Sequence, residues 1–192
     1  MRIYRAIKTD YKTQGFDAAP CMVEFYKKYG MTAHGGMDWG AFTGEPVSWD
    51  CDLPGTVLNT EVDNSGGLGI NVITESPEGI LKHRFWHLKG FYVNAGDKVE
   101  IGDLLGWADN TGASTGTHLH RDIKKMVRLE NGSLAVELPG NGTYGTIRYD
   151  KWFENKFVLD TPEGKKNNDG LIRKILIMII ERLLKGRQNN QS

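Results

Sequence analysis

The chain has 192 residues, 39% of them hydrophobic, which suffices for one well-buried domain and an appendage but not for two full domains. Its formal net charge is zero, yet residues 1–164 hold 17 Lys and Arg against 22 Asp and Glu, whereas residues 165–192 hold 7 against 2. The acidic body argues against nucleic acid as a partner, and the basic tail predicts an anionic one, such as a phospholipid head group or a cell-wall polymer.

The start of the chain does not resemble a secretory signal. Met1 to Lys8 is basic but lacks the apolar run of about 7–15 residues that such a signal requires. If the protein works outside the cytoplasm, we therefore expect that something else delivers it. The two cysteines, Cys21 and Cys51, can pair or stay free, so they leave the redox compartment undetermined.

Glycine-rich turns predict many short strands rather than long helices. The 24 Gly stand against 6 Pro, and Asn-Gly and Gly-Gly turns recur, so the expected fold class is mainly β. In chain order we expect one or two helical turns over Met22 to Tyr29, a loop or strand from His34 to Gly44, and short β runs at Pro46-Val47, Gly55 to Leu58 and Ile70 to Ile73. A strand follows over Ile80 to Val93, another lies between Gly96 and Gly106, and a third begins at His118.

The last third of the chain predicts the end of the domain and a separate helix. Leu129 to Gly145 resembles a hairpin with Asn-Gly turns, and Trp152, Phe153 and Phe157 are expected to fix the end of the domain to its core. We therefore divide the chain into a domain over residues 1–160, a linker over 161–170 and an amphipathic helix over 171–187.

The predicted C-terminal helix is apolar on one broad face. Within Leu171 to Lys185 that face holds Ile172, Ile175, Leu176, Ile179, Ile180, Leu183 and Leu184, while Lys174, Glu181, Arg182 and Lys185 gather opposite. Its apolar run is far shorter than the roughly 20 residues that span a bilayer. Two interpretations stay open: the helix lies on a membrane surface, or it packs on the domain or on a neighbouring subunit. The oligomeric state is left open.

Two histidine motifs predict a metal site. His118 and His120 are two apart on a predicted strand, so their side chains share a face. His34 and Asp38 are four apart on a glycine-rich segment that is not helical, and an even spacing again gives one face. Either spacing alone is a weak signal, and the prediction depends on their conjunction.

The ligand types favour a catalytic zinc over a structural one. A catalytic zinc site uses three protein ligands, drawn from His and carboxylate, and leaves a position for water. His34, Asp38 and one histidine of the 118/120 pair supply that number and those types. His87 and the other member of the pair remain for proton transfer or oxyanion stabilisation near neutral pH. His83 is expected to be a surface or packing residue.

At these residues the chain resembles the lysostaphin/LytM type of zinc metallopeptidase, cell-wall endopeptidases that cut the peptide cross-links of peptidoglycan. The resemblance covers about residues 14–128. Its motifs are His34-Gly-Gly-Met-Asp38, Gly67-Leu-Gly-Ile-Asn-Val72, Trp86-His87-Leu88, Val93 to Val99 and the run from Asn110 to His120, Asn-Thr-Gly-Ala-Ser-Thr-Gly-Thr-His-Leu-His. Together these motifs are highly specific.

The resemblance implies an antiparallel β-sheet core with a groove floored by the site. It also implies that His34, Asp38 and His120 bind one Zn²⁺, and that His118 and His87 are the catalytic pair, serving as base and oxyanion stabiliser. It assigns no substrate-binding residue. The sequence departs from the usual pattern at Thr117 and at Arg121, where Pro and an aromatic residue are common. These departures are expected to affect loop rigidity and the groove surface.

The expected function is hydrolysis of peptide cross-links at the bacterial cell wall or periplasm. The lack of a secretory signal and the basic tail suggest delivery by lysis, a holin or a virion, as for a phage-borne lysin. One alternative is a non-catalytic wall-binding or amidase-activating relative of the same fold. Another is a sugar-phosphotransfer carrier with paired histidines, which gives no reason for Asp38.

Overall fold

The structure, a computed structural model, describes residues 1–17, 22–63 and 67–167, and short strands dominate it. The strands are β1 (Ile3–Arg5), β2 (Lys12–Gln14), β3 (Met37–Gly40), β4 (Pro46–Ser48), β5 (Gly55–Asp63), β6 (Gly67–Ser76), β7 (Gly79–Trp86), β8 (Leu88–Phe91), β9 (Lys98–Val99), β10 (Leu104–Ala108), β11 (His118–Arg128), β12 (Leu134–Val136) and β13 (Phe153–Phe157). Helical structure consists of α1 (Val23–Lys27), the 3-10 turns η2 (Asp150–Trp152) and η3 (Val158–Asp160), and a stretch over 162–167. The predicted mainly β class is confirmed.

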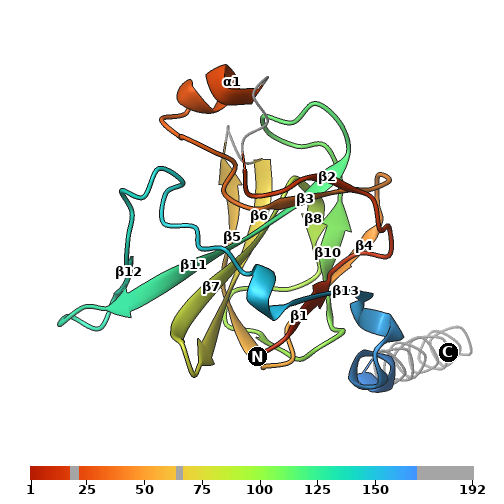
Figure 1. Cartoon of the computed structure of the whole chain (residues 1–192). Coiled ribbons are helices and arrows are strands. Elements are labelled where there is room, and N and C mark those ends of the chain that lie inside the picture. The colour runs from red at the N-terminus through yellow and green to blue at the C-terminus, as the bar shows by residue number, and fades with distance from the viewer. Residues whose placement is uncertain (18–21, 64–66, 168–192) are drawn as a thin grey trace, which may run out of the picture.

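A large antiparallel sheet forms the body of the molecule (Figure 1). Its strand order is β2-β3-β11-β7-β6-β5-β9, and β12 pairs with β11 at one side. Residues alternate along the strands, so β6 directs Ile70 and Val72 into the core while Asn71 between them faces the other way. One face of the sheet is therefore apolar, and the opposite face is free to carry polar side chains.

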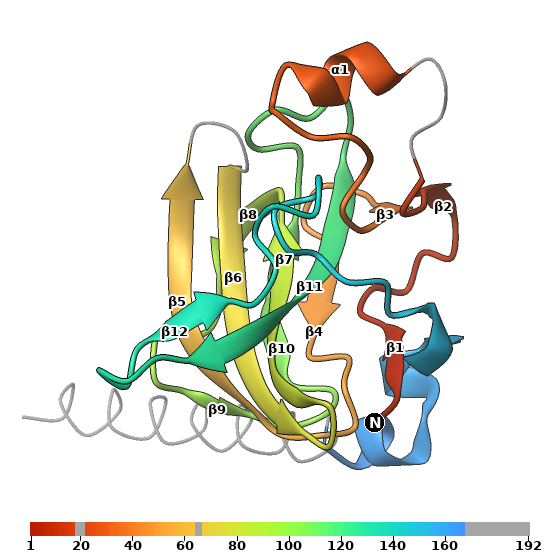
Figure 2. The ribbon, with the colours of Figure 1, turned by 60° about the vertical axis from the view of Figure 1, so that its left-hand side comes forward.

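A smaller sheet of order β4-β10-β8 packs on the apolar face of the large one (Figure 2). The buried core lies between the two sheets and takes side chains from both: Val47, Leu88, Leu105 and Ala108 from the small sheet, and Val57, Ile70, Val72, Leu81, Phe85, Leu119 and Ile123 from the large one. Trp49, which is fully buried, fills the space between them. Because the small sheet covers the apolar face, the opposite face of the large sheet is the one that can present a functional site.

The predicted continuous strand over Ile80 to Val93 is broken at His87, and its last two residues lie beyond the end of β8. His87 has a φ of +65°, and the chain passes there from β7 in the large sheet to β8 in the small one. A positive φ is uncommon for a residue other than glycine, which is why an aromatic, strand-like sequence gave no sign of the break.

Helix α1 covers one end of the large sheet, the end opposite the N-terminus (Figures 1 and 2). It confirms the short helix expected within Met22 to Tyr29, and the chain leaves it at Gly30 with a φ of +68°. The Asn131-Gly132 turn is also confirmed, as the connection between β11 and β12. Asn141-Gly142 forms a turn as well, but in a loop rather than between paired strands.

The two ends of the described chain meet. Strand β1 pairs in parallel with β13, and Trp152 and Phe153 pack against the main core, as the sequence predicts. The described part of the predicted linker also contacts the domain: residues 162–167 are helical, and Asn167 donates from Nδ2 to the carbonyl of Ile101 at 2.8 Å. The polar composition of this segment did not predict that it packs on the domain, because its contacts are made by backbone and amide groups.

The predicted tail helix over 171–187 and Cys21 lie outside the described residues. Cys51 is buried, and burial raises the pKa of its thiol to about 12. In the described ranges, no helix has the length and apolar character needed to cross a membrane.

Candidate metal and catalytic site

A cleft of about 370 Å³ lies on the polar face of the large sheet, and four of the five histidines line it. Strands β3, β7 and β11 form its floor, while α1 and the loops at 113–115 and 143–146 form its walls. A second hollow, of about 320 Å³, lies elsewhere, around Met37 and Trp39, and no histidine lines it. The histidine motifs predicted from the sequence therefore meet in one place.

Strand register brings the two motifs together. His120 on β11 is paired with Asp38 on β3, and His118 is paired with Gly40 two residues further along. Alternation then turns Asp38, His118 and His120 to the cleft while Leu119 enters the core. His34 precedes β3 in a loop and reaches the same point.

Glycine at position 36 permits this approach. A Cβ there would lie 2.6 Å from the carbonyl oxygen of Arg121 and 2.9 Å from the ring of His120, closer than real side chains come. The His34 loop therefore passes directly against β11 only because residue 36 has no side chain.

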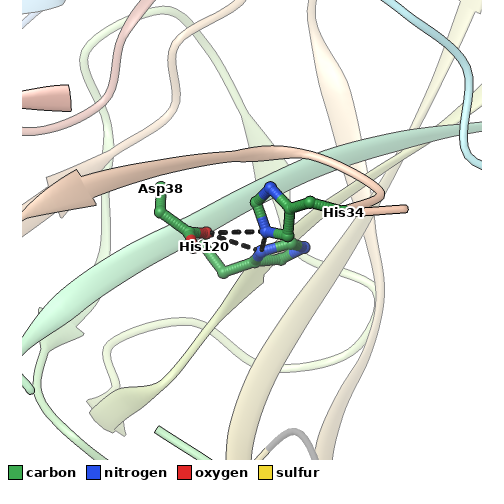
Figure 3. A group of neighbouring side chains, drawn as sticks. All are labelled: His34, Asp38 and His120. Carbon is green, nitrogen blue, oxygen red and sulfur yellow. Dashed lines mark hydrogen bonds and ion pairs between the residues drawn. The ribbon is translucent and has the colours of Figure 1, made fainter. Parts of the chain in front are cut away.

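His34, Asp38 and His120 point three donor atoms at one spot (Figure 3). Asp38 Oδ1 lies 2.8 Å from His120 Nδ1 and 3.1 Å from His34 Nε2, and the two nitrogens are 3.0 Å apart. All three residues are buried or nearly so. Two imidazole nitrogens and a carboxylate oxygen make a donor set of the kind that zinc takes in catalytic sites.

Each of the two imidazoles turns its outer nitrogen to a hydrogen-bond acceptor, so its inner nitrogen can give up a proton and bind a metal. His34 Nδ1 lies 2.7 Å from the carbonyl of Gly15, which only accepts, so Nδ1 donates and Nε2 keeps its lone pair. His120 Nε2 lies 3.2 Å from Oδ2 of Asp122, so Nδ1 keeps its lone pair when Nε2 donates. Three electron-rich atoms then face one another at about 3 Å, an arrangement that a cation stabilises. The residues fit a divalent metal.

The site's charges favour deprotonated carboxylates. Burial opposes this, but hydrogen bonds and charge from His120 and His34 hold the pKa of Asp38 below its ordinary value. In return, and against the effect of burial, Asp122 and Asp38 raise the pKa of His120 to about 9, so a metal ion bound at this ring takes the place of a proton. Asp122 is likewise buried, and Arg84 and His120 lower its pKa. Both acids are therefore anionic near neutral pH and available as a donor and as a hydrogen-bond acceptor.

His87 and His118 lie side by side next to this cluster. Their ring centroids are 4.5 Å apart, and His118 Nε2 is 3.7 Å from Asp38 Oδ2. His87 Nδ1 donates to the carbonyl of Thr111 at 2.7 Å, and His118 Nδ1 donates to the carbonyl of Gly116 at 2.8 Å. Each ring therefore has its Nε2 left for chemistry in the cleft.

Backbone strain accompanies this placement of His87. At the point where β7 ends, the left-handed backbone of His87 turns its side chain into the cleft, and this conformation is strained for a residue other than glycine. Burial, and then the neighbouring His118, lower the pKa of His87 to about 4. The ring is therefore neutral at physiological pH in this environment.

The structure decides two sequence expectations, one about His83 and one about Arg121. His83 is fully buried, so of the two roles expected for it the packing role holds: its Nδ1 accepts from Arg121 at 2.6 Å, and its ring meets Trp49 edge to face. Arg121 was expected to affect the groove surface, and this is wrong. Its odd position on β11 points it to the core, where it forms a buried ion pair with Asp50 at 2.9 Å.

Sequence reasoning missed four charged residues of the cleft: Asp63, Arg84, Asp122 and Lys124. Asp122 and Lys124 continue the even positions of β11 after His120, so the same alternation that paired the histidines places them on the same face. That signal was available. Arg84 could be placed in the cleft only from the pairing of β7 with β11, in which it lies opposite Asp122.

Comparison with known proteins agrees with this geometry. The sequence model described as Peptidase family M23 matches residues 32–133, more than half of the chain. The chain is 31% identical over 116 residues to lysostaphin of Staphylococcus simulans, covering 58% of this chain, and 34% identical over 87 residues to glycyl-glycine endopeptidase ALE-1 of Staphylococcus capitis, covering 45%. It spans 22% and 23% of the length of these two relatives.

Solved structures show the same fold. The catalytic domain of the antimicrobial peptidase lysostaphin from Staphylococcus simulans aligns with a TM-score of 0.50 at 25% identity, over 67% of this chain and 90% of that domain. A zinc-containing peptidase from Vibrio cholerae aligns with a TM-score of 0.51 at 25% identity, over 64% of this chain and 36% of that one. The predicted antiparallel core of this type is confirmed.

Proposed function

The chain belongs to Peptidase family M23, and from this membership we propose that it is a zinc-dependent endopeptidase that hydrolyses peptide cross-links of bacterial peptidoglycan. The observation that carries the proposal is the meeting of His34 Nε2, Asp38 Oδ1 and His120 Nδ1 within 3.1 Å of one another beside a second pair of imidazoles. The similarity to lysostaphin and to a glycyl-glycine endopeptidase supports peptidoglycan peptides as the substrate class.

In this proposal His34, Asp38 and His120 hold the zinc ion. The chemistry that zinc supplies when bound is Lewis acidity towards the scissile carbonyl and the attacking water. Asp122 orients His120 by accepting from its Nε2, and the carbonyl of Gly15 orients His34.

His118 and His87 act between them as base and oxyanion stabiliser. Because each commits Nδ1 to a backbone carbonyl, the nitrogen that meets the reacting groups is Nε2 in both rings. A neutral Nε2 accepts the proton of the attacking water, and the same atom, once protonated, donates to developing negative charge or to the leaving amine. The 4.5 Å between the ring centroids lets both serve one scissile bond.

The proposal places the protein's action at the bacterial cell wall or periplasm. Delivery by lysis, a holin or a virion, as for a phage-borne lysin, belongs to the same proposal and is supported by the basic, amphipathic composition of residues 171–187. Contact of that segment with a membrane surface is part of the proposal.

Metal analysis and fragment analysis together test the function. We expect one zinc per chain in the purified protein, and release of soluble fragments from purified peptidoglycan that stops with a chelator and returns with added zinc. Mass analysis of the fragments from two peptidoglycan types identifies the cleaved bond. Zinc content without fragment release, but with binding to the wall, would instead favour the non-catalytic relative.

A further inference from the structure

The polar face of the large sheet is organised in cross-strand rows. His120, Trp86, Gly69 and Glu61 form one row across β11, β7, β6 and β5. Asp122, Arg84, Asn71 and Asn59 form the next row, and Lys124 and Lys82 lie in the row after that. Rows are two residues apart, or about 7 Å along the strands. Two cations that line the cleft, Arg84 and Lys124, therefore lie one and two rows beyond the metal ligand His120.

Arg84 is held over the cleft floor but keeps hydrogen-bonding capacity. Its guanidinium lies 4.9 Å from the ring centre of Trp86, and its side chain is 21% exposed. Nη1 lies 3.6 Å from Oδ2 of Asp122, which is ion-pair distance but too long for a good hydrogen bond. Its Nε is buried and has no partner. The flat ring fixes the guanidinium without satisfying its donors.

Lys124 is a largely buried cation without a carboxylate partner. It is 7% exposed, and among the described residues no ion pair or hydrogen bond joins its ammonium group to another side chain. Burial and then the charge of Arg84 lower the pKa of Lys124 to about 8. An ammonium group in this position loses part of its hydration, and the charges of Asp122 and Glu61 offset this loss only in part, since neither carboxylate forms an ion pair with it.

Two carboxylates, Asp122 and Glu61, lie near the three cations Arg84, Lys124 and Lys82. Asp122 accepts from His120 Nε2 at 3.2 Å through Oδ2, while its buried Oδ1 has no hydrogen-bond partner, and Glu61 accepts from Asn59 Nδ2 at 3.0 Å. Asp63 also lines the cleft, but by register it lies two rows from Arg84 towards His118, about 13 Å along the strands, and it has an interaction of its own. The cations at this end of the cleft therefore exceed the carboxylates that can pair with them.

We propose that Arg84 and Lys124 form a subsite for a free carboxylate of the substrate peptide, held one to two sheet rows from the metal site. The inference rests on the proposed function and deepens it: the preferred substrate is an acidic peptide rather than a neutral one such as oligoglycine. A carboxylate between the two side chains accepts from the guanidinium of Arg84 and pairs with the ammonium of Lys124. It makes the direct contacts that Asp122, at 3.6 Å from Arg84, does not make.

Amidation of the substrate tests the subsite. Soluble cross-linked peptidoglycan fragments are divided, and in one half the carboxylates are converted to amides with a carbodiimide and excess ammonia. The full chain, saturated with zinc, is assayed on both halves by mass analysis of the products. We expect kcat/KM on the unmodified fragments to exceed that on the amidated ones by about tenfold or more, mainly through KM.

Matched variants assign the preference to these side chains. Lys124→Met alone, and together with Arg84→Gln, should bring the ratio of the two rates towards one, whereas Arg84→Lys should keep part of the preference. Lys82→Gln is the control, because Lys82 lies beside Arg84 and Lys124 on the same face but does not line the cleft. A ratio within one variant is independent of how much of that variant folds.

The outcomes separate the two proposals. Equal cleavage of both halves by the unsubstituted chain, or a preference that survives the double substitution, contradicts the subsite and leaves the peptidase function intact. Cleavage of neither half by the zinc-saturated chain contradicts the proposed function itself. Loss of the preference in Lys82→Gln would also contradict the assignment to Arg84 and Lys124.

Discussion

Asp122 Oδ2 lies 3.2 Å from Nε2 of His120, on the side of the ring that faces away from the metal cluster. The contact leaves Nδ1 of His120 as the atom that meets Asp38 and His34. A carboxylate in this position both orients a ligand imidazole and increases its basicity. Asp122 is 2% exposed, so water does not substitute for it.

Asp122→Asn should weaken zinc binding by about 10–100-fold, because the amide keeps the shape but loses the charge that supports His120. Competition with a chromophoric chelator measures the affinity. Glu137→Gln is a matched control, since Glu137 pairs with Lys125 at the surface, away from the cleft. An unchanged affinity in Asp122→Asn would show that the hydrogen bond has no part in holding the metal.

His87→Ala should retain zinc while kcat falls by about 10²–10⁴-fold, because His87 lines the cleft without joining the three-donor cluster. His34→Ala and Asp38→Ala should lose both zinc and activity. Zinc content and peptidoglycan solubilisation are measured on the same preparations. Full activity in His87→Ala, or loss of its zinc, would overturn the division of roles.

Gly36→Ala should destabilise the protein by about 1–3 kcal/mol and reduce zinc retention, because the new methyl group meets the Arg121 carbonyl and the His120 ring. Urea unfolding and metal analysis report the two effects. Gly140→Ala is the control, since a Cβ at Gly140 would meet nothing within 4 Å. Equal stability of the two variants would contradict the close approach of the His34 loop to β11.

Acid should destabilise the fold partly through His83. Burial, and then the charge of Arg121, hold the pKa of His83 well below 6.5, while in the unfolded chain it returns to about 6.5. Below that pH the unfolded state takes up a proton that the native state does not, so the free energy of unfolding falls by up to about 1.4 kcal/mol per pH unit for this group.

His83→Gln should therefore lose less stability than the unsubstituted chain between pH 7 and pH 5, as measured by urea unfolding at both values. The glutamine oxygen can still accept from Arg121. His87, whose pKa is lowered to about 4, contributes in the same direction in both proteins and does not affect the comparison. An identical loss in the two proteins would mean that His83 is protonated in the native state.

A chain ending at Asn167 should keep its activity on purified peptidoglycan but lyse intact cells less well than the full chain, if the segment from 171 to 185 acts at a membrane. The cut belongs after Asn167 rather than earlier in the predicted linker 161–170, because Asn167 is hydrogen-bonded to Ile101 and Gly164 is buried. Turbidity of a cell suspension and release from isolated walls separate the two activities. Equal lysis of intact cells would count against a role for the tail.

Much of the site could be predicted because β-strand alternation is a local rule. It placed His118 and His120 on one face before any pairing was known. The even spacing of His34 and Asp38 gave the same expectation for that pair, but His34 lies in the loop before β3, so strand alternation does not explain its approach to Asp38. What it could not supply was the register between β3 and β11, which sets Asp38 opposite His120 through contacts far apart in sequence.

Other features were missed for identifiable physical reasons. The break at His87 depends on a left-handed backbone that the sequence disfavours there, and the surroundings of the cleft maintain it. The burial of Arg121 follows from its odd position on β11 together with a distant partner, Asp50. The resemblance to a family in which an aromatic residue is common at this position therefore led to the wrong prediction that Arg121 lies at the groove surface.

The eleven residues of β11 also constrain how this protein can change. Sliding the strand by one position against its neighbours would send both imidazoles inward and bring Leu119 and Ile123 out to solvent. Sliding by two would keep the faces but part His120 from Asp38. Lengthening is therefore tolerable in the turn after this strand, at Asn131-Gly132, whereas a single inserted or deleted residue within the strand would dismantle the metal site and the apolar core at once.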